Sequence, residues 1–449
     1  MSSAEATDRV AVLHPELPRL LDAVLVVGPD ADGERPGLAE VAAAALRVAP
    51  DGTVPGPPTR SGPDGRLHVV VSATARTADG AAWVADPPSG LPDGVTTALR
   101  AVLAEDAGET ALHPLRPGWH RRGWWDDVTA WVDEALADLQ LAPRTGPLRP
   151  RQVWSMSAVV EVPTTTGRYW LKAVPPHFAR EPAVIDGVRG ASAPERAAGA
   201  ALPGLPRTLA SATEPGGAVR LLMTDSGPVP DDVLPGERER LTAGFARLQA
   251  ATAPRLGPVA GRAGLDDRSP SALAAGLARL TAEGIELGRL TDAERTALAE
   301  RLPRDRDRLL ALAGTGLPPL LVHGDYHPWN AVRHPGWADG EEVAIDWTDA
   351  SVGVAGLDLV PLAGLRSTGE VDAGPVVDAY VVALAGALGA AEATVRAAVT
   401  AALPAAWLVQ ALAYEGILRA AEPLSHHEFT GCQERSLRGW LRGVPADGG

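Results

Sequence analysis

Residues 323–330 read HGDYHPWN, and residues 345–347 read IDW. Each segment follows a short apolar run, which we expect to form a buried strand. The first segment then becomes a polar loop, because its proline disfavours a helix at this point. We expect the side chains of Asp325, Asn330 and Asp346 to lie close together where these two strands end.

The residue types in this group suit phosphoryl transfer. That reaction needs a positioned nucleophile and neutralised charge rather than covalent work by the protein. Asp325 would accept the proton of a substrate hydroxyl, and Asn330 and Asp346 would hold Mg²⁺ through oxygen atoms. The alternative is an incidental Asp and Asn in a buried loop, because the D-x-x-x-x-N spacing alone is common. The His-Gly prefix, the paired strands and the later I-D-W, all in order, favour the catalytic interpretation.

With these motifs the chain resembles the aminoglycoside phosphotransferase and choline kinase-like superfamily, which carries H-G-D-x-x-x-x-N and then I-D-W. Residues 353–359, GVAGLDL, are similar to the G-x-x-x-x-D-L segment of that family. The resemblance covers residues 150–420. It implies an α+β, two-lobed protein kinase-like fold with a small β-rich N-lobe and a helical C-lobe, with ATP as co-substrate and Mg²⁺ as cofactor. It also implies that Asp358 braces the catalytic loop and that His323 supports it.

The nucleotide-binding half is expected upstream, in a hairpin. Residues 157–162 and 168–174 are β-rich runs separated by a polar turn that ends in glycine. Lys172 falls in the middle of the second run, where it must contact an anion or extend to solvent. We interpret it as the lysine that contacts the ATP phosphates, and a solvent-exposed edge lysine is the alternative. Glu181 lies near the start of a predicted helix and can pair with Lys172.

Two further segments are expected to contact the nucleotide. The loop before the hairpin contains Ser155 and Ser157 but no G-x-G-x-x-G pattern, so hydroxyls and backbone amides would cover the phosphates there. Residues 219–227 read as an apolar strand that ends in a turn. The resemblance implies that the end of this strand is the hinge between the lobes. The backbone of Met223 and Thr224 would then bind the adenine.

Composition narrows the class of protein. A chain of 449 residues is long enough for two or three domains. Its net charge of −15 disfavours nucleic acid as a partner. The charge would favour a cationic substrate, although a solvated acidic surface is the more common reason for such a charge. The single cysteine, Cys432, excludes an internal disulfide, and the first residues lack the apolar stretch of a signal peptide. We expect a cytoplasmic enzyme with a small-molecule substrate and no membrane partner, and the sequence leaves the oligomeric state open.

The division of the chain is predicted from changes in composition. Residues 1–110 are expected to form an α/β appendage or cap domain, with a helix at 38–49, a loop at 51–65, strands at 66–71 and 81–84, and a helix at 96–105. The remaining segments are an amphipathic helix and linker at 111–150, a nucleotide-binding N-lobe at 151–225, and a helical C-lobe with the catalytic loops at 226–449.

Helical spacing of apolar residues predicts several helices. In residues 124–140 an apolar stripe recurs at helical intervals, and we expect it to pack between the appendage and the N-lobe, with sugar stacking as the minority interpretation. The stripe consists of Trp124, Val128, Trp131, Ala135 and Leu139.

In the C-lobe, residues 236–251, 271–282 and most of 371–445 are expected to be helical. A helix at 290–312 is expected to break at Pro303. Residues 397–414 are uncharged, but we expect two buried helices that break at Pro404 rather than a membrane span.

These observations predict an ATP- and Mg²⁺-dependent phosphotransferase that acts on a hydroxyl of a small molecule, most simply an aminoglycoside or related amino-sugar compound. A sugar kinase similar to maltokinase or glucosamine kinase, with an N-terminal cap, is the main alternative. A catalytically inactive pseudokinase is disfavoured because the expected base, metal ligands and lysine are all present. A protein kinase is disfavoured because the sequence lacks an A-P-E-like segment. Candidate substrate contacts, chosen by position and charge, are Asp231, Asp232, Asp349 and Glu415.

Overall fold

The computed structural model describes residues 8–13, 20–21, 25–27, 53–55, 60–62, 65–72, 83–333, 342–364 and 373–443. The chain divides into two units. The first, called the sheet unit below, comprises Met1–Pro176, Leu209–Met223 and Arg419–Glu428, and the second, called the helical unit, comprises His177–Thr208, Thr224–Leu418 and Phe429–Gly449. The combination of largely antiparallel sheets and helices gives the α+β class that the sequence predicts.

The N-terminal part of the sheet unit is a seven-stranded sheet with the order β4-β6-β1-β2-β7, in which β3 also pairs with β1 and β5 with β6. The strands are β1 (Asp8–Leu13), β2 (Leu20–Leu21), β3 (Leu25–Val27), β4 (Thr53–Pro55), β5 (Arg60–Gly62), β6 (Gly65–Ser72) and β7 (Trp83–Val84). Helix α2 (Asp93–Asp106) buries Leu99 and Val102 in one cluster with Leu67 and Val69 of β6.

Most of the predicted elements in this region are present. The strand at 66–71 and the helix at 96–105 are confirmed as β6 and α2, and the described part of the strand at 81–84 is β7. The loop predicted at 51–65 is wrong in part, because β4 and β5 form within it by pairing with β6. Such pairing depends on a partner strand, which local composition does not reveal. The helix predicted at 38–49 lies outside the described residues.

A second, five-stranded sheet of this unit has the order β11-β12-β10-β9-β8. Its strands are β8 (Arg149–Val153), β9 (Ala158–Thr164), β10 (Gly167–Val174), β11 (Thr208–Thr213) and β12 (Val219–Thr224). The predicted hairpin is confirmed as β9 and β10, which are antiparallel with Lys172 opposite Val159. Strand β8 begins inside the predicted linker, because residues 149–153 pair with β9.

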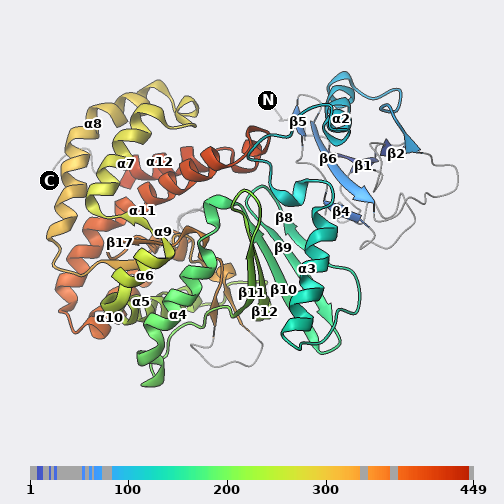
Figure 1. Cartoon of the computed structure of the whole chain (residues 1–449). Coiled ribbons are helices and arrows are strands. Elements are labelled where there is room, and N and C mark those ends of the chain that lie inside the picture. Colours follow the sequence, from blue (N-terminus) through green and yellow to red (C-terminus); the bar gives the residue numbers. More distant parts are fainter. Residues whose placement is uncertain are drawn as a thin grey trace. The chain divides into compact units, whose positions relative to one another are not determined.

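Helix α3 (Trp124–Asp138) packs on this second sheet (Figure 1). Its buried face differs from the predicted stripe in the second half of the helix. Val132 and Leu136 are buried there, whereas Leu139 follows the last helical residue and is 40% exposed. Trp131 is only partly buried, and the guanidinium carbon of Arg220 lies 5.0 Å from its ring centroid. The apolar face therefore follows i, i+4, i+8 and i+12 from Trp124 and packs against the five-stranded sheet, whereas packing against the appendage stays a prediction.

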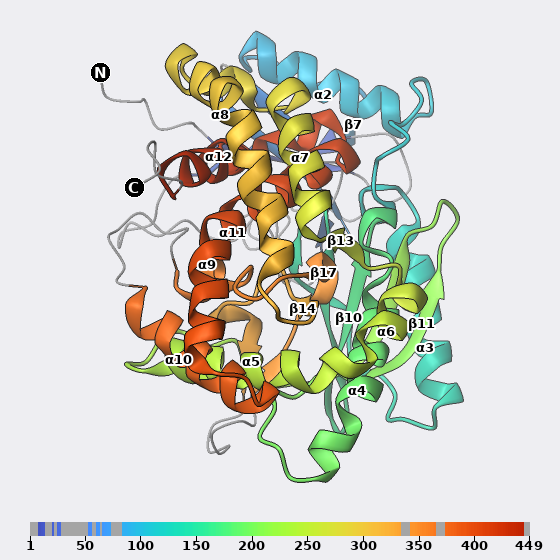
Figure 2. The same cartoon turned by 90° about the vertical axis from the view of Figure 1, so that its left-hand side faces the viewer.

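The helical unit contains α4 to α12 and two small sheets. Its helices are α4 (Glu181–Ala197), α5 (Glu237–Thr252), α6 (Leu256–Ala263), α7 (Pro270–Glu283), α8 (Asp292–Ala311), α9 (Leu359–Leu362), α10 (Gly374–Leu388), α11 (Glu392–Ala420) and α12 (Cys432–Gly443). The three-stranded sheet has the order β13-β17-β14, from β13 (Asp266–Arg268), β17 (Ser351–Gly353) and β14 (Leu320–Val322). The two-stranded sheet pairs β15 (Ala331–Val332) with β16 (Val343–Ala344). The helices predicted at 236–251 and 271–282 are confirmed as α5 and α7, and α7 packs beside α8 (Figure 2).

The two predicted helix breaks at prolines are wrong. Helix α8 continues through Pro303, and α11 continues through Pro404. A proline inside a helix removes one hydrogen bond and costs about 3 kcal/mol. Here the apolar residues on both sides of each proline are buried in one core cluster, including Leu298 and Leu309 in α8, and this packing holds each helix together.

Helix α11 is long and apolar enough by length and composition to cross a membrane, with a mean hydropathy of 1.5 over its most apolar window. Its apolar residues nevertheless lie in the two core clusters of the helical unit, where Val399 and Leu408 are fully buried. We therefore describe α11 as a core helix.

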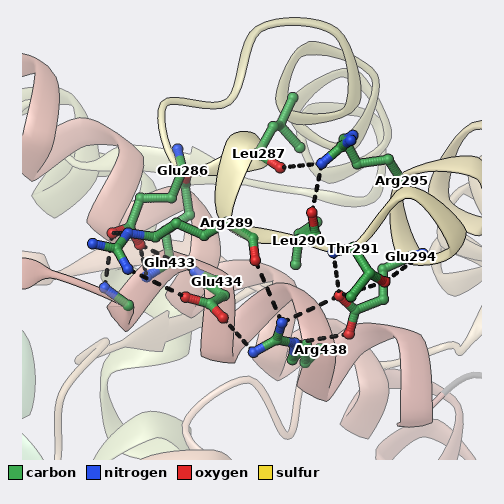
Figure 3. Close-up of polar contacts among 11 residues, drawn as sticks. Glu286, Leu287, Arg289, Leu290, Thr291, Glu294, Arg295, Gln433, Glu434 and Arg438 are labelled. Atoms are coloured by element: carbon green, nitrogen blue, oxygen red, sulfur yellow. Dashed lines mark hydrogen bonds and ion pairs between the residues drawn. The ribbon is translucent and has the colours of Figure 1, made fainter. Parts of the chain in front are cut away.

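Polar contacts fix α8 and α12 at the edge of this core (Figure 3). Helix α8 begins with a capping box, in which Thr291 and Glu294 each accept a backbone N–H from the other. Arg438 of α12 donates to the carboxylates of Glu294 and Glu434. The hydrogen bond to Arg438, with those from Thr291, lowers the pKa of Glu294 to about 2.

Candidate active site

The loop of residues 323–330, called the catalytic loop after its expected role, leaves strand β14 through a glycine that no other residue could replace without strain. Gly324 has φ +88°, and a Cβ at this position would lie 2.7 Å from the backbone oxygen of Asp349. Its N–H donates to Oδ1 of Asp358 at 2.8 Å, and its carbonyl accepts from Nε2 of Gln410 at 2.6 Å. These two bonds fix the backbone immediately before Asp325.

His323 joins the catalytic loop to the I-D-W segment. The imidazole is fully buried, and burial lowers its pKa to about 4, so the ring is neutral at pH 7. Its Nδ1 accepts from the N–H of Asp325 at 3.3 Å, and Nε2 lies 3.0 Å from the carbonyl oxygen of Ile345. The neutral ring therefore carries its proton on Nε2 and donates it to Ile345. The ring also packs against Trp347, with centroids 4.5 Å apart.

Asp325 and Asn330 lie on the same loop and are joined by a hydrogen bond. The side chain of Asp325 is 28% exposed, and its Oδ1 lies 3.7 Å from Nε2 of His327. The side-chain amide of Asn330 donates to the carbonyl oxygen of Asp325 at 2.9 Å, so its Oδ1 is directed away from that carbonyl. The backbone of Asn330 accepts from the N–H of Ile345 at 2.9 Å, which brings Asn330 next to the residue that precedes Asp346.

Asp346 has a backbone conformation that a non-glycine residue seldom adopts. Its φ is +65° and its ψ is +64°, in the left-handed region. Such strain persists where the surroundings hold it, and it is concentrated at functional sites. The hydroxyl of Thr348 donates to Oδ1 of Asp346 at 2.8 Å, and the N–H of Trp347 donates to Oε1 of Glu181 at 3.1 Å. The indole N–H of Trp347 donates to the carbonyl of Ala344 at 2.8 Å.

Asp358 belongs to a buried polar network that supports β14 and the catalytic loop. Its Oδ2 accepts from Nε2 of Gln249 at 3.2 Å, and the same nitrogen donates to the carbonyl of Leu321 at 2.6 Å. The hydroxyl of Tyr380 donates to Oε1 of Gln249 at 2.6 Å and accepts from the N–H of Gly356 at 3.2 Å. Burial raises the pKa of Tyr380. Gln249, Tyr380 and Gln410 were not predicted, because they come from three separate helices and carry no local motif.

The sheet unit holds the residues expected to contact the nucleotide phosphates. Lys172 lies in β10 and is 6% exposed. Ser155 is buried, and its backbone N–H and hydroxyl both donate to Oε2 of Glu428, at 3.0 and 2.6 Å. The hydroxyl of Ser157 accepts from the indole N–H of Trp154 at 2.6 Å. Both serine hydroxyls therefore have partners within this unit.

The remaining predicted positions fall in different surroundings. Met223 and Thr224 end β12, and the chain passes from the sheet unit to the helical unit between them. Asp231 and Asp232 are exposed. Glu415 is buried, and its Oε2 accepts from the N–H of Ile285 at 3.1 Å. This carboxylate is therefore bonded to the backbone in the interior of the helical unit.

The oxygen atoms of Asn330 and Asp346 are suitable for magnesium. Within the part of the chain that the structure describes, no group of three or more His, Cys, Asp or Glu residues could hold a metal ion. Magnesium does not need such a group, because it is usually bound by one or two carboxylates together with substrate phosphates and water. An amide oxygen and a carboxylate, brought together by the contact between Asn330 and Ile345, fit that requirement.

Several solved phosphotransferase structures match the chain at low identity. They include a macrolide 2'-phosphotransferase from Brachybacterium faecium (16% identity, 71% of this chain and 99% of that chain, TM-score 0.43). Others are an aminoglycoside phosphotransferase complex with GDP and kanamycin (13% identity, 69% and 99%, TM-score 0.46) and a spectinomycin phosphotransferase complex with ADP and spectinomycin (11% identity, 70% and 98%, TM-score 0.42). No curated protein matches the chain.

The sequence profile of the phosphotransferase enzyme family matches residues 154–398, which is more than half of the chain. The matched region contains the H-G-D-x-x-x-x-N loop, the I-D-W segment and Lys172. The chain thus belongs to the phosphotransferase enzyme family, and it is a small-molecule kinase.

Proposed function

We propose that the protein transfers the γ-phosphoryl group of ATP, with Mg²⁺, to a hydroxyl of a small molecule. The observation that carries this proposal is the arrangement of the catalytic loop. Asp325 is partly exposed, while Asp358 and Gln410 fix the backbone of Gly324 immediately before it and His323 accepts its own N–H. A fixed and accessible carboxylate is what a general base requires.

The residues have separate roles in this reaction. Asp325 orients the acceptor hydroxyl and takes up its proton as the oxygen attacks phosphorus. Asn330 and Asp346 would hold magnesium, which when bound neutralises charge on the phosphate oxygens. Lys172 would contact the phosphates, with Glu181 as its expected partner, and the backbone around Met223 and Thr224 would bind the adenine. The loop with Ser155 and Ser157 is the expected phosphate cover.

An aminoglycoside or related amino-sugar compound is the acceptor that we favour. The net charge of −15 supports a cationic acceptor. Trp329 lies on the catalytic loop between Asp325 and Asn330 and is 44% exposed, so it offers an apolar surface to a ring-bearing substrate. We place the reaction in the cytoplasm, where a protein with a single cysteine and an ATP requirement would be expected.

A sugar kinase with an N-terminal cap is the second candidate. The observation that favours it is the seven-stranded sheet with α2, which forms a hydrophobic cluster of its own before the region that matches the family. In this alternative, residues 1–110 act as a cap domain, and the same catalytic residues phosphorylate a neutral sugar or glucosamine.

Replacement of the proposed base tests the reaction. Asp325→Asn keeps the size of the side chain but cannot accept the proton, so we expect kcat to fall by about 10²- to 10⁴-fold. Nucleotide affinity, measured by calorimetry, should stay within about twofold of the unmodified protein, because Asp325 contacts the acceptor. A variant that keeps more than about a third of the original kcat would remove Asp325 from this role.

A further inference from the structure

Helix α4 begins with two adjacent charged residues that both contact the segment following Asp346. Oε1 of Glu181 accepts the N–H of Trp347 at 3.1 Å. Nη2 of Arg180, the residue before the helix, lies 3.4 Å from the carbonyl oxygen of Thr348. The backbone on both sides of the peptide between Trp347 and Thr348 is thus held from the same end of α4.

Arg180 is itself fixed by a carboxylate from another element. Its two terminal nitrogens donate to the two oxygens of Asp266, at 3.0 and 2.9 Å, in a bidentate pair. Asp266 begins β13, which runs parallel to β17 with Asp266 opposite Ser351. The strand that anchors Arg180 is therefore bonded to the chain only a few residues after Asp346. A planar guanidinium suits such a site, because its donors engage a carboxylate and a neighbouring carbonyl together.

The segment that these residues hold is strained and chemically important. Asp346 has φ +65°, a conformation that is unfavourable for a residue other than glycine. The carbonyl and hydroxyl of Thr348 have different partners, since the carbonyl lies near Arg180 and the hydroxyl donates to Oδ1 of Asp346 at 2.8 Å. A shift of the Thr348 backbone would therefore also move the hydrogen bond that orients the Asp346 carboxylate.

We propose that Arg180, anchored by Asp266, is a positioning residue that sets the orientation of the Asp346 carboxylate for magnesium. The proposal rests on the proposed role of Asp346 as a magnesium ligand. Arg180 acts through Thr348 and does not touch the metal or the reacting atoms. Its removal should weaken the effect of magnesium on nucleotide binding and leave metal-free nucleotide binding unchanged.

A purely structural ion pair would behave differently. Asp266 is 40% exposed at its side chain and Arg180 is 16% exposed, and partly exposed pairs contribute little to stability. A structural role would produce a small loss of stability with no change in magnesium dependence. The two roles are therefore separated by magnesium dependence rather than by melting temperature.

The test is calorimetric titration of the full chain with the non-hydrolysable ATP analogue AMP-PNP, at increasing magnesium concentrations and in EDTA. For Arg180→Gln we expect the magnesium concentration at half-maximal effect to rise by about tenfold, the size expected from losing one charge-assisted hydrogen bond. Affinity in EDTA should not change. Arg180→Lys should recover part of the loss, because it keeps the charge but not the bidentate geometry.

Arg189→Gln is the matched control. Arg189 lies on the same helix and donates to the backbone carbonyl of Leu205, and it has no contact with residues 346–348 among the hydrogen bonds of the described chain. We expect its magnesium dependence to equal that of the unmodified protein. If Arg180→Gln does not fold, Asp266→Asn gives the same readout, with an expected shift of about threefold because a single amide oxygen holds Arg180 less firmly.

Two results would overturn the proposal. Equal magnesium dependence in Arg180→Gln, Arg189→Gln and the unmodified protein would make Arg180 structural, while the proposed function would stand. Absence of any magnesium effect on AMP-PNP binding in the unmodified protein would contradict the role of Asp346, and both proposals would fail together.

Discussion

At the scale of single residues, the site depends on a neutral histidine at its centre. His323 connects the backbone of Asp325 to that of Ile345, and its neutral form supplies one acceptor and one donor for these bonds. A protonated ring could not accept the N–H of Asp325. The lowered pKa of His323 therefore keeps the two loops joined near pH 7.

This pKa shift predicts a pH dependence of stability. The pKa of His323 is about 4 in the folded protein and near 6.5 in the unfolded chain, so the unfolded chain binds more protons between these values. The contribution of His323 to the free energy of unfolding is complete above pH 6.5 and is lost as the pH falls towards 4. We expect urea denaturation to show that the stability difference between the unmodified protein and His323→Gln shrinks across this range.

Gln is the suitable replacement because its amide can still donate to the carbonyl of Ile345 but does not titrate. The two proteins share all other titrating groups, so their difference isolates His323. A stability difference that stays constant from pH 7 to pH 4 would contradict the neutral, buried state of this ring.

The sequence was sufficient to single out the residues to which we assign the chemistry, but not those that hold them in place. Asp325, Asn330 and Asp346 stand at recognisable spacings beside apolar runs. Gln249 and Gln410 meet the catalytic loop only because α5 and α11 pack around β14 and its loop, and their positions along the chain give no sign of this. The contact of Glu181 with Trp347 was missed for the same reason.

At the scale of elements, α12 is fixed by an acidic side chain from a distant part of the chain. The carboxylate of Glu286 accepts the backbone N–H groups of Gly431, Gln433 and Glu434, at 2.8, 3.0 and 3.2 Å (Figure 3). The N–H of Glu286 donates in return to Oε1 of Gln433 at 2.8 Å. A negative charge at a helix N-terminus also interacts favourably with the helix dipole.

Glu286→Ala should therefore destabilise the protein. Glu286 is 7% exposed, and its loss would leave three N–H groups at the start of α12 without this acceptor. We expect the free energy of unfolding to fall by about 2–3 kcal/mol, the range for hydrogen bonds to a charged group. Urea denaturation measures the change. Glu300→Ala, at an exposed position of α8, is the control and should change stability by less than about 0.5 kcal/mol. Equal losses in the two variants would show that Glu286 does not cap α12.

Element prediction succeeded where apolar spacing was local and failed where the tertiary structure determined the outcome. The hairpin β9–β10 and the helices α3, α5 and α7 follow directly from residue patterns. The continuous helices through Pro303 and Pro404 do not, because burial on both sides of each proline outweighs its intrinsic cost. Strands β4 and β5 form through pairing with β6, which a local pattern cannot show.

At the scale of the whole molecule, the chain consists of two units that contain different parts of the proposed site. The sheet unit carries Lys172 and the N-terminal seven-stranded sheet, and the helical unit carries the catalytic loop and the segment with Asp346. The family match begins at residue 154, so the seven-stranded sheet, α2 and α3 lie outside it. The family could be predicted from two short motifs, whereas the acceptor could not, because its contacts are not confined to a motif.

The most direct test of the central claim is an ADP-release assay with the full-length protein, ATP and Mg²⁺, across aminoglycosides, amino sugars, maltose and small alcohols. The account predicts that one acceptor class gives stoichiometric ADP and a product heavier by one phosphoryl group in mass spectrometry. Asp325→Asn should lower the rate of both signals by about 10²- to 10⁴-fold while still binding ATP. A protein that binds ATP with magnesium but phosphorylates no acceptor, or one whose turnover is unaffected by Asp325→Asn, would contradict it.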